Sequence, residues 1–222
     1  MRVIATVHND FPTKFGLPRQ SGLVEALRAR VVFAPEYRVR EALRGLEDFS
    51  HLWLIWGFHQ AQRDSWSPTV RPPRLGGNTR MGVFATRSPF RPNPIGLSCV
   101  RLLGIEEGED GPALRIAGAD MMDGTPVYDI KPYLPYADCH PEATGGFTAE
   151  VAKRRVRVEA APGLLSPLSD TQRACLLEAL AEDPRPAYQQ DPERVYGFLF
   201  GQWNVRFQVQ DGVLTVLALT PA

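Results

Sequence analysis

Two arginines stand among three prolines in residues 82–98, which read GVFATRSPFRPNPIGLS. Each proline fixes φ at about −65° and lacks an N–H donor, so this segment cannot lie inside a helix or a central strand. A stiff, extended turn would hold Arg87 and Arg91 still, and their planar guanidinium groups suit a carboxylate or a phosphate. The segment is therefore a candidate anion-binding loop. The alternative is a rigid surface corner whose arginines contact only water.

Three further polar segments are expected between strands, and each one alone is weak support for a site. They are residues 15–20 (FGLPRQ), His59 with Gln60, and residues 120–126 (DMMDGTP). The last segment is also typical of a turn, because Asp, Gly and Pro serve turn geometry directly. His59 could equally be a hydrogen-bonded residue at the edge of the core. Only the combination of these segments would indicate a site.

Positive charge is concentrated locally, although the formal net charge of the chain is zero. From Arg63 to Arg101 the sequence holds seven arginines and one acidic residue, Asp64, which leaves a local excess of six positive charges. Such a patch can hold a phosphate backbone through counterion release. Scattered, solvated arginines are the alternative. We expect a phosphate-facing patch.

The first part of the chain reads as a series of short strands. The expected strands are Val3–Val7, Ala29–Phe33, His51–His59, Met81–Ala85, Ile95–Leu103, Ala113–Gly118 and Val127–Ile130, with a possible helical turn at Glu36–Leu43. In residues 51–59, the even-numbered side chains from 52 to 58 are expected to face the core, and the other face could line a site at its His59 end. Because strand follows strand without helices, we expect a mainly β fold with an antiparallel β-barrel core.

A small α+β unit is expected over residues 161–222, after a barrel domain over residues 1–160. Ser169-Asp170-Thr171-Gln172 has the form of a capping box, apolar residues follow at helical spacing, and Asp183-Pro184 ends the run. Asp211-Gly212 supplies the residues of a tight type I′ turn between two alternating strands. One helix and one hairpin make an appendage that should lean on the main domain or on a partner.

Several classes of protein are disfavoured by what the sequence lacks. It has no Gly-x-Gly-x-x-Gly, Gly-Lys-Ser/Thr, Gly-x-Ser-x-Gly or His-Glu-x-x-His motif, which argues against dinucleotide and ATP chemistry. Cys99, Cys139 and Cys175 are odd in number and widely spaced, and the histidines show no ligand spacing, so neither a disulfide scaffold nor a metal site is expected. No apolar run approaches the ~20 residues of a membrane span, and no secretory signal opens the chain. We expect a cytoplasmic protein.

Taken together, the polar segments resemble one family, the TrmO family, also called TsaA-like proteins. The matching segments stand in the family's order and phrasing: PRQ at 18–20, residues 51–60, PPRLGGN at 72–78, residues 82–98, residues 120–133 and DPRPAY at 183–188. The resemblance covers nearly the whole chain. It implies an S-adenosylmethionine-dependent tRNA methyltransferase with a β-barrel core, acting as a homodimer. The implied substrate is tRNA carrying N6-threonylcarbamoyladenosine just 3′ of the anticodon, at adenosine 37, and the methyl group goes to N6.

The resemblance also assigns site residues. The implied cofactor contacts are Pro18, Arg19, Gln20, His59, Gln60, Arg87, Leu97, Asp120, Met121, Met122, Asp123, Gly124 and Thr125. An arginine suits the methionyl carboxylate of the cofactor, carboxylates suit its sulfonium and amino groups, and an apolar wall suits its adenine. The candidates for tRNA binding are Arg74, Arg91, Arg185, Tyr188 and Arg194. Arginine and tyrosine bind phosphates and stack on splayed bases, although Tyr188 and Tyr196 could instead pack the small core.

One departure from the family lies near the N-terminus, where relatives usually read Ile-Arg-Ser-Pro and this chain reads Val7-His8-Asn9-Asp10. A contact made by that arginine would have to come from elsewhere. In-line methyl transfer mainly needs orientation, but the attacking nitrogen belongs to a urea-like group whose lone pair is delocalised. A carboxylate or imidazole could take its proton, with Asp123 and His59 as candidates. Proximity alone is the alternative.

Two functions from other classes stay open on the sequence. A tRNA-binding module without catalysis would bind RNA with steep salt dependence and transfer no methyl group. A β-barrel enzyme on a small-molecule substrate would be indifferent to RNA. The intact set of motifs favours an active RNA methyltransferase.

Overall fold

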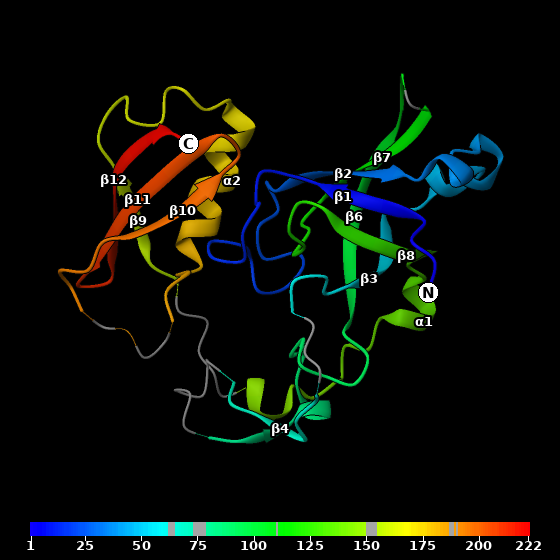
Figure 1. Ribbon diagram of the computed structural model, residues 1–222, viewed down its shortest axis with the longest axis horizontal. Coiled ribbons are helices and arrows are strands. Elements are labelled where there is room, and N and C mark those ends of the chain that lie inside the picture. The colour runs from blue at the N-terminus through cyan, green and yellow to red at the C-terminus, as the bar shows by residue number, and fades with distance from the viewer. Residues whose placement is uncertain (62–64, 73–78, 110, 150–154, 187–188, 190) are drawn as a thin grey trace.

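The computed structural model describes residues 1–222 except 62–64, 73–78, 110, 150–154, 187–188 and 190. Within the described residues the fold is mainly β and antiparallel, as predicted. Six strands form a closed barrel in the order β1-β2-β7-β6-β3-β8, and four strands form a second sheet in the order β10-β11-β12-β9. Figure 1 shows the two units side by side, with the blue segment that follows β1 between them.

The barrel strands lie close to the predicted positions. They are β1 (Ala5–His8), β2 (Arg28–Phe33), β3 (His51–Gly57), β6 (Ile95–Gly108), β7 (Gly111–Ala117) and β8 (Thr125–Pro132). Short 3-10 turns at Pro35–Tyr37 and Arg40–Leu43 occupy the predicted helical turn. Two further turns, at Leu46–Asp48 and Gly146–Thr148, and the short helix α1 (Pro135–Asp138) lie in connections. The predicted strand at 81–85 is only partly a strand, because β5 (Met81–Gly82), paired with β4 (Thr69–Val70), gives way to a 3-10 turn at Val83–Ala85.

The core of the barrel contains the predicted face of β3. Leu52, Leu54 and Trp56 are buried, which confirms the alternation read from the sequence. Phe58 is only half-buried because β3 ends at Gly57, after which the Phe58 N–H donates to the carbonyl of Pro94. The end of β3 is thereby tied to the proline-rich loop.

The C-terminal unit contains the predicted helix and hairpin. Its elements are β9 (Arg157–Ala160), α2 (Asp170–Ala181), β10 (Tyr196–Phe200), β11 (Trp203–Gln210) and β12 (Val213–Pro221). Ser169 and Gln172 form the predicted capping box of α2. Asp211 and Gly212 both have positive φ, 50° and 77°, as a type I′ turn requires. In addition, β9 pairs in parallel with β12, so residues 157–160 lie in this sheet.

The connection between β1 and β2, residues 9–27, packs against the C-terminal unit. The ring of Phe11 is fully buried, and its centroid lies 5.2 Å from that of Phe200 and 6.4 Å from that of Phe198. Phe15 lies 6.2 Å from Phe207. Gly16 meets the Phe198 ring so closely that a Cβ there would lie 2.5 Å from it. An aromatic cluster therefore joins the two units.

Polar contacts fix the two ends of the same connection. The Gly201 N–H donates to the carbonyl of Asp10 at 2.6 Å, and Gln172 Nε2 donates to the Asp10 carboxylate at 3.3 Å. Farther along, the Ala26 N–H donates to Glu178 Oε2 at 3.0 Å. Helix α2 thus holds both ends of the connection, and the position of residues 18–20 within it depends on the C-terminal unit.

Phe11→Ala tests this packing. We expect the free energy of unfolding to fall by about 3–5 kcal/mol, because the change leaves a cavity in a buried aromatic cluster. Equilibrium urea unfolding measures the loss, and Phe84→Ala, which truncates an exposed ring, is the matched control with an expected change within about 0.5 kcal/mol. Equal effects of the two substitutions would contradict the assignment.

Candidate functional site

The proline-rich loop gives its two arginines different surroundings. The Thr86 hydroxyl donates to the carbonyl of Val83 at 2.9 Å, and Arg91 Nη1 donates to the carbonyl of Thr86 at 2.9 Å. Arg91 therefore stabilises the conformation of its own loop through this hydrogen bond. Arg87, which is exposed, donates through Nη1 to Gln20 Oε1 at 2.5 Å. Arg87 thus links this loop to the connection at residues 9–27.

Strand β6 begins directly after this loop and sends alternate side chains to opposite sides. Ser98 is buried inside the barrel wall, whereas Leu97 is 56% exposed and pairs with Ile55 of β3. The structure therefore places Leu97 on the side opposite to Ser98, and of these two residues Ser98 is the one bonded to the carboxylate of Asp120.

A chain of hydrogen bonds joins three segments inside the barrel. Trp56 Nε1 donates to Ser98 Oγ at 2.9 Å, and Ser98 Oγ donates to Asp120 Oδ1 at 2.5 Å. The Trp56 indole lies across Gly96, where a Cβ would be 2.2 Å from the ring. Glycine is therefore required beside the indole. Trp56 and Ser98 were not among the predicted site residues, although Ser98 ends the segment that the sequence singled out.

Asp120 is a half-buried carboxylate on which the positive charge of Arg87 acts. Burial raises the pKa of Asp120 above its usual range, while the hydrogen bond from Ser98 and the charge of Arg87 lower it. The structure thus brings together three of the predicted cofactor residues, Gln20, Arg87 and Asp120. A carboxylate and a guanidinium close enough for their charges to interact can bind a zwitterionic group such as an amino acid moiety.

The segment after Asp120 is bonded to the end of β1. Asp123 Oδ1 accepts from His8 Nδ1 and from the Asn9 N–H, both at 3.2 Å. Asn9 Nδ2 donates to the carbonyl of Met121 at 2.8 Å, and the Gly124 N–H donates to the carbonyl of Val7 at 2.8 Å. His8 is a titratable partner of Asp123 that the sequence analysis did not name as a site residue. The available signal was that His8 stands at the departure from the family pattern.

The other predicted cofactor residues of the segment 120–126 contribute to packing and to the turn itself. Met121 and Thr125 are buried, and Met122 is half-buried. The Thr125 N–H donates to the carbonyl of Met122 at 3.3 Å, which closes a turn around Asp123 and Gly124. The turn reading of this segment and its place at the candidate site are therefore compatible.

Arg19 and Arg185 meet at the boundary with the C-terminal unit. Arg19 Nη2 donates to the carbonyl of Arg185 at 2.8 Å, next to the buried Pro18. The Arg185 guanidinium forms two hydrogen bonds with the Asp183 carboxylate, at 2.8 and 2.9 Å, and its side chain is only 16% exposed. The bond with Asp183 raises the pKa of Arg185. Arg185 thus shapes this boundary more than it offers a free cation.

The remaining predicted residues lie elsewhere. His59 is half-buried and Gln60 exposed beyond the end of β3, and no hydrogen bond or ion pair between His59 and Asp123 is present in the described part of the chain. Arg194 lies over the ring of Tyr196 at 5.4 Å from its centroid, and that ring is buried, so Tyr196 packs the small core. Arg74 and Tyr188 fall outside the described residues.

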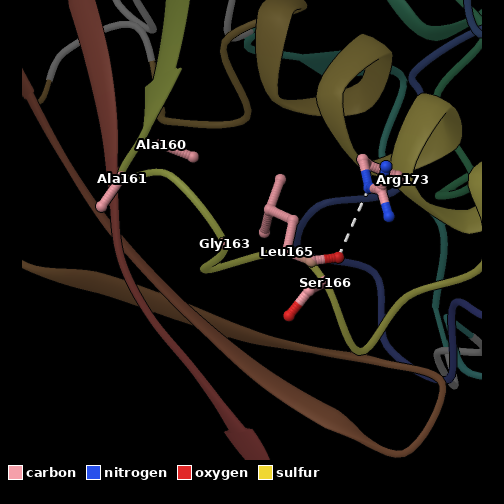
Figure 2. A pocket seen from close by; sticks show the side chains of 6 residues that line it. All are labelled: Ala160, Ala161, Gly163, Leu165, Ser166 and Arg173. Carbon is pink, nitrogen blue, oxygen red and sulfur yellow. Dashed lines mark hydrogen bonds between the residues drawn. The ribbon is translucent and has the colours of Figure 1, made fainter.

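Two hollows lie away from the predicted residues. One, of about 280 Å³, is lined by Ala160, Ala161, Gly163, Leu165, Ser166 and Arg173. Figure 2 shows the Arg173 guanidinium turned to the carbonyl of Leu165, to which Nε donates at 3.4 Å. The other, of about 550 Å³, lies between residues 13–15 and the sheet of the C-terminal unit. Since Arg173 also contacts Asp170 and the carbonyl of Leu168, the first hollow is part of the packing of α2.

The described residues contain no group of three or more His, Cys, Asp or Glu side chains that could hold a metal ion. The three cysteines are free. The helices of the described ranges are too short or too polar to span a membrane.

Asp120→Asn tests the burial of the carboxylate. Because burial raises the pKa of Asp120 in the folded state, its ionisation near neutral pH lowers the free energy of unfolding. We expect the variant to be more stable than the wild type at about pH 7.5 and the difference to vanish below about pH 3, where the wild-type carboxyl is protonated in both states. Urea unfolding at the two pH values measures this, with the exposed Glu142→Gln as control. A variant no more stable at pH 7.5 would refute it.

Comparisons with known proteins find matches over nearly the whole chain. The family model described as the tRNA-methyltransferase O N-terminal domain matches residues 6–139, and the TrmO C-terminal domain matches residues 153–222. The tRNA (adenine(37)-N6)-methyltransferase of Escherichia coli is 43% identical over 98% of this chain and 96% of its own length. A Pseudomonas aeruginosa protein whose name includes the words S-adenosylmethionine-dependent methyltransferase is 45% identical over 87% of this chain and 85% of its own. A crystal structure of TrmO from P. aeruginosa superposes with a TM-score of 0.80 at 35% identity, covering 99% of this chain and 95% of that one. The chain belongs to the TrmO family.

Proposed function

We propose that this protein is a tRNA methyltransferase that transfers a methyl group from S-adenosylmethionine to N6 of threonylcarbamoyladenosine at adenosine 37. The observation that carries the proposal is that Arg87 is hydrogen-bonded to Gln20 and acts through its charge on Asp120, so that three family segments converge. The similarity along nearly the full length of the E. coli tRNA (adenine(37)-N6)-methyltransferase supports the reaction and the position.

The residues at this place fit the methionyl part of the cofactor. Asp120 is half-buried, and Arg87 is the one charged group whose effect on its pKa is resolved, so the carboxylate suits a bound ammonium or sulfonium group. Arg87 is exposed and suits the carboxylate. When bound, S-adenosylmethionine supplies a methyl carbon with a good leaving group. The chain's own task is to orient that group and the acceptor nitrogen, since orientation is the main requirement of an in-line transfer.

Proton removal from the acceptor nitrogen is assigned to Asp123 or His59. Asp123 has one carboxylate oxygen, Oδ1, engaged with His8 and the Asn9 N–H, which fixes its orientation. Its other oxygen is the proton acceptor in this proposal. His59 stands on a separate loop at the end of β3, so the two residues are distinct candidates that can be tested one at a time.

The proposal extends to the assembly and the compartment. A homodimer and a cytoplasmic location follow from the resemblance to the family and from the sequence. The free cysteines are in keeping with a reducing compartment. Arg91 and Arg194 are the described residues of the predicted tRNA contacts whose guanidinium groups lie over aromatic rings.

Nucleoside mass analysis tests the reaction. Purified protein incubated with S-adenosylmethionine and bulk tRNA should add one methyl group to threonylcarbamoyladenosine. Controls omit S-adenosylmethionine or use tRNA that lacks the threonylcarbamoyl group, and both should give no product. Protein that binds tRNA with steep salt dependence but adds no methyl group would be a binding module instead.

Asp123→Asn and His59→Ala test the base. Since a positioned base contributes about 10²–10⁴-fold, the variant that lacks it should lose at least about 10²-fold in turnover at saturating S-adenosylmethionine. Single-turnover methylation measures this, with binding of S-adenosylmethionine as the check that each variant still forms the site. Near-normal turnover of both variants would leave proximity as the explanation.

A further inference from the structure

Two large aromatic rings are exposed side by side near the ribbon of β4 and β5. Trp66 is 50% exposed and Phe84 is 71% exposed. Their ring centroids are 6.1 Å apart, and the ring planes differ by 28°, which is a stacked arrangement. Neither ring belongs to the buried core, and the methyl-transfer site described above does not use them. An exposed stack of this kind marks a binding surface more often than an isolated surface aromatic does.

The backbone holds the two rings in place. The strands pair Thr69 with Gly82 and Val70 with Met81, and the Val83 N–H donates to the carbonyl of Pro68 at 2.9 Å. Trp66 lies just before this ribbon and Phe84 just after it, so the pairing brings the rings together. The rings are therefore positioned before a ligand arrives, which lowers the entropy lost on binding.

An arginine completes the stack. The Cζ atom of Arg91 lies 5.9 Å from the centroid of Phe84, and the same guanidinium donates to the carbonyls of Thr86 and Ser88. Arg91 is thus held over one ring by its own loop. A column of indole, phenyl and guanidinium planes offers the flat surfaces on which nucleic-acid bases stack.

The chain segment that carries the rings is rich in positive charge. From residue 65 to residue 101 the sequence contains six arginines and no aspartate or glutamate. Arg71 follows β4 and Arg80 precedes β5, and both are exposed. The ligand that matches such a surface carries negative charge and flat rings together. A second copy of the same ribbon would instead bring like charges face to face.

We propose that Trp66 and Phe84 form a stacking platform for an unpaired base of the tRNA anticodon loop, with Arg71 and Arg80 placed to contact the backbone phosphates beside it. The inference rests on the proposed function, because it takes tRNA as the substrate, and it adds a contact that holds the RNA outside the methyl-transfer site. Single-stranded bases stack on aromatic side chains without regard to their identity, so the platform supports affinity rather than sequence choice.

The test compares variants that keep or remove a flat ring. Trp66→Leu and Phe84→Ala should each weaken binding of an anticodon stem-loop RNA by about 5- to 150-fold, while Trp66→Phe and Phe84→Tyr should stay close to the wild type. The matched control is Tyr136→Ala, which removes an aromatic ring that is 87% exposed in α1 and should leave binding unchanged. Fluorescence anisotropy gives the dissociation constant, and the KM for tRNA should rise while binding of S-adenosylmethionine is unaffected.

Each outcome has a distinct meaning. Unchanged RNA affinity in Trp66→Leu and Phe84→Ala, with wild-type protein that methylates tRNA, would overturn the platform and leave the proposed function standing. A change from dimer to monomer in these variants, measured by sedimentation, with intact RNA affinity per site, would also overturn it and make the ring pair a contact between copies of the chain. Wild-type protein that neither binds nor methylates tRNA would overturn both. Weaker binding in Leu and Ala variants that the Phe and Tyr variants do not share would establish stacking.

Discussion

The aromatic packing of residues 9–27 against the C-terminal sheet is the contact on which the candidate site depends. Phe11 and Phe15 insert among Phe198, Phe200 and Phe207, and this fixes the connection between β1 and β2. Gln20 stands on that connection and receives the hydrogen bond from Arg87. The C-terminal unit therefore contributes to the site without supplying any of its three converging residues, because it supports the segment that carries Gln20.

The hydrogen-bonded chain of Trp56, Ser98 and Asp120 contains a carboxylate whose desolvation lowers the free energy of unfolding. Asp120 is partly withdrawn from water, and the Ser98 hydroxyl, backbone hydrogen bonds at Asp120 and Ser21 and the charge of Arg87 offset that desolvation only in part. Ser98, which donates to Asp120, is in turn fixed by the Trp56 indole that lies across Gly96. A carboxylate oriented in this way is ready to accept a cation, and its orientation does not have to be reached during binding. The arrangement is unfavourable for the protein without a ligand, because the desolvation of Asp120 outweighs the contacts that offset it.

Local patterns explain which parts of the fold could be predicted. The capping box of α2, the turn at Asp211-Gly212 and the alternation of β3 all depend on residues a few positions apart, and the structure confirms each of them. The family segments also pointed to Gln20, Arg87 and Asp120. By contrast, the pairing of β9 with β12, the contact of Arg19 with the carbonyl of Arg185 and the bond between His8 and Asp123 join distant parts of the chain. No spacing rule in a single sequence specifies such partners.

The long separation between the connection and its partners also governs the order in which the molecule can assemble. Asp10 and Gln172 are 162 positions apart, and the rings that surround Phe11 lie still farther along the chain. Closing such a large loop comes late, because its entropy is lost before the contacts that compensate for it can form. During synthesis the barrel strands can pair while residues 9–27 still lack the helix and sheet that hold them. The site is therefore expected to be among the last features to form, and an unfinished chain would have a barrel wall but no ordered place for Gln20.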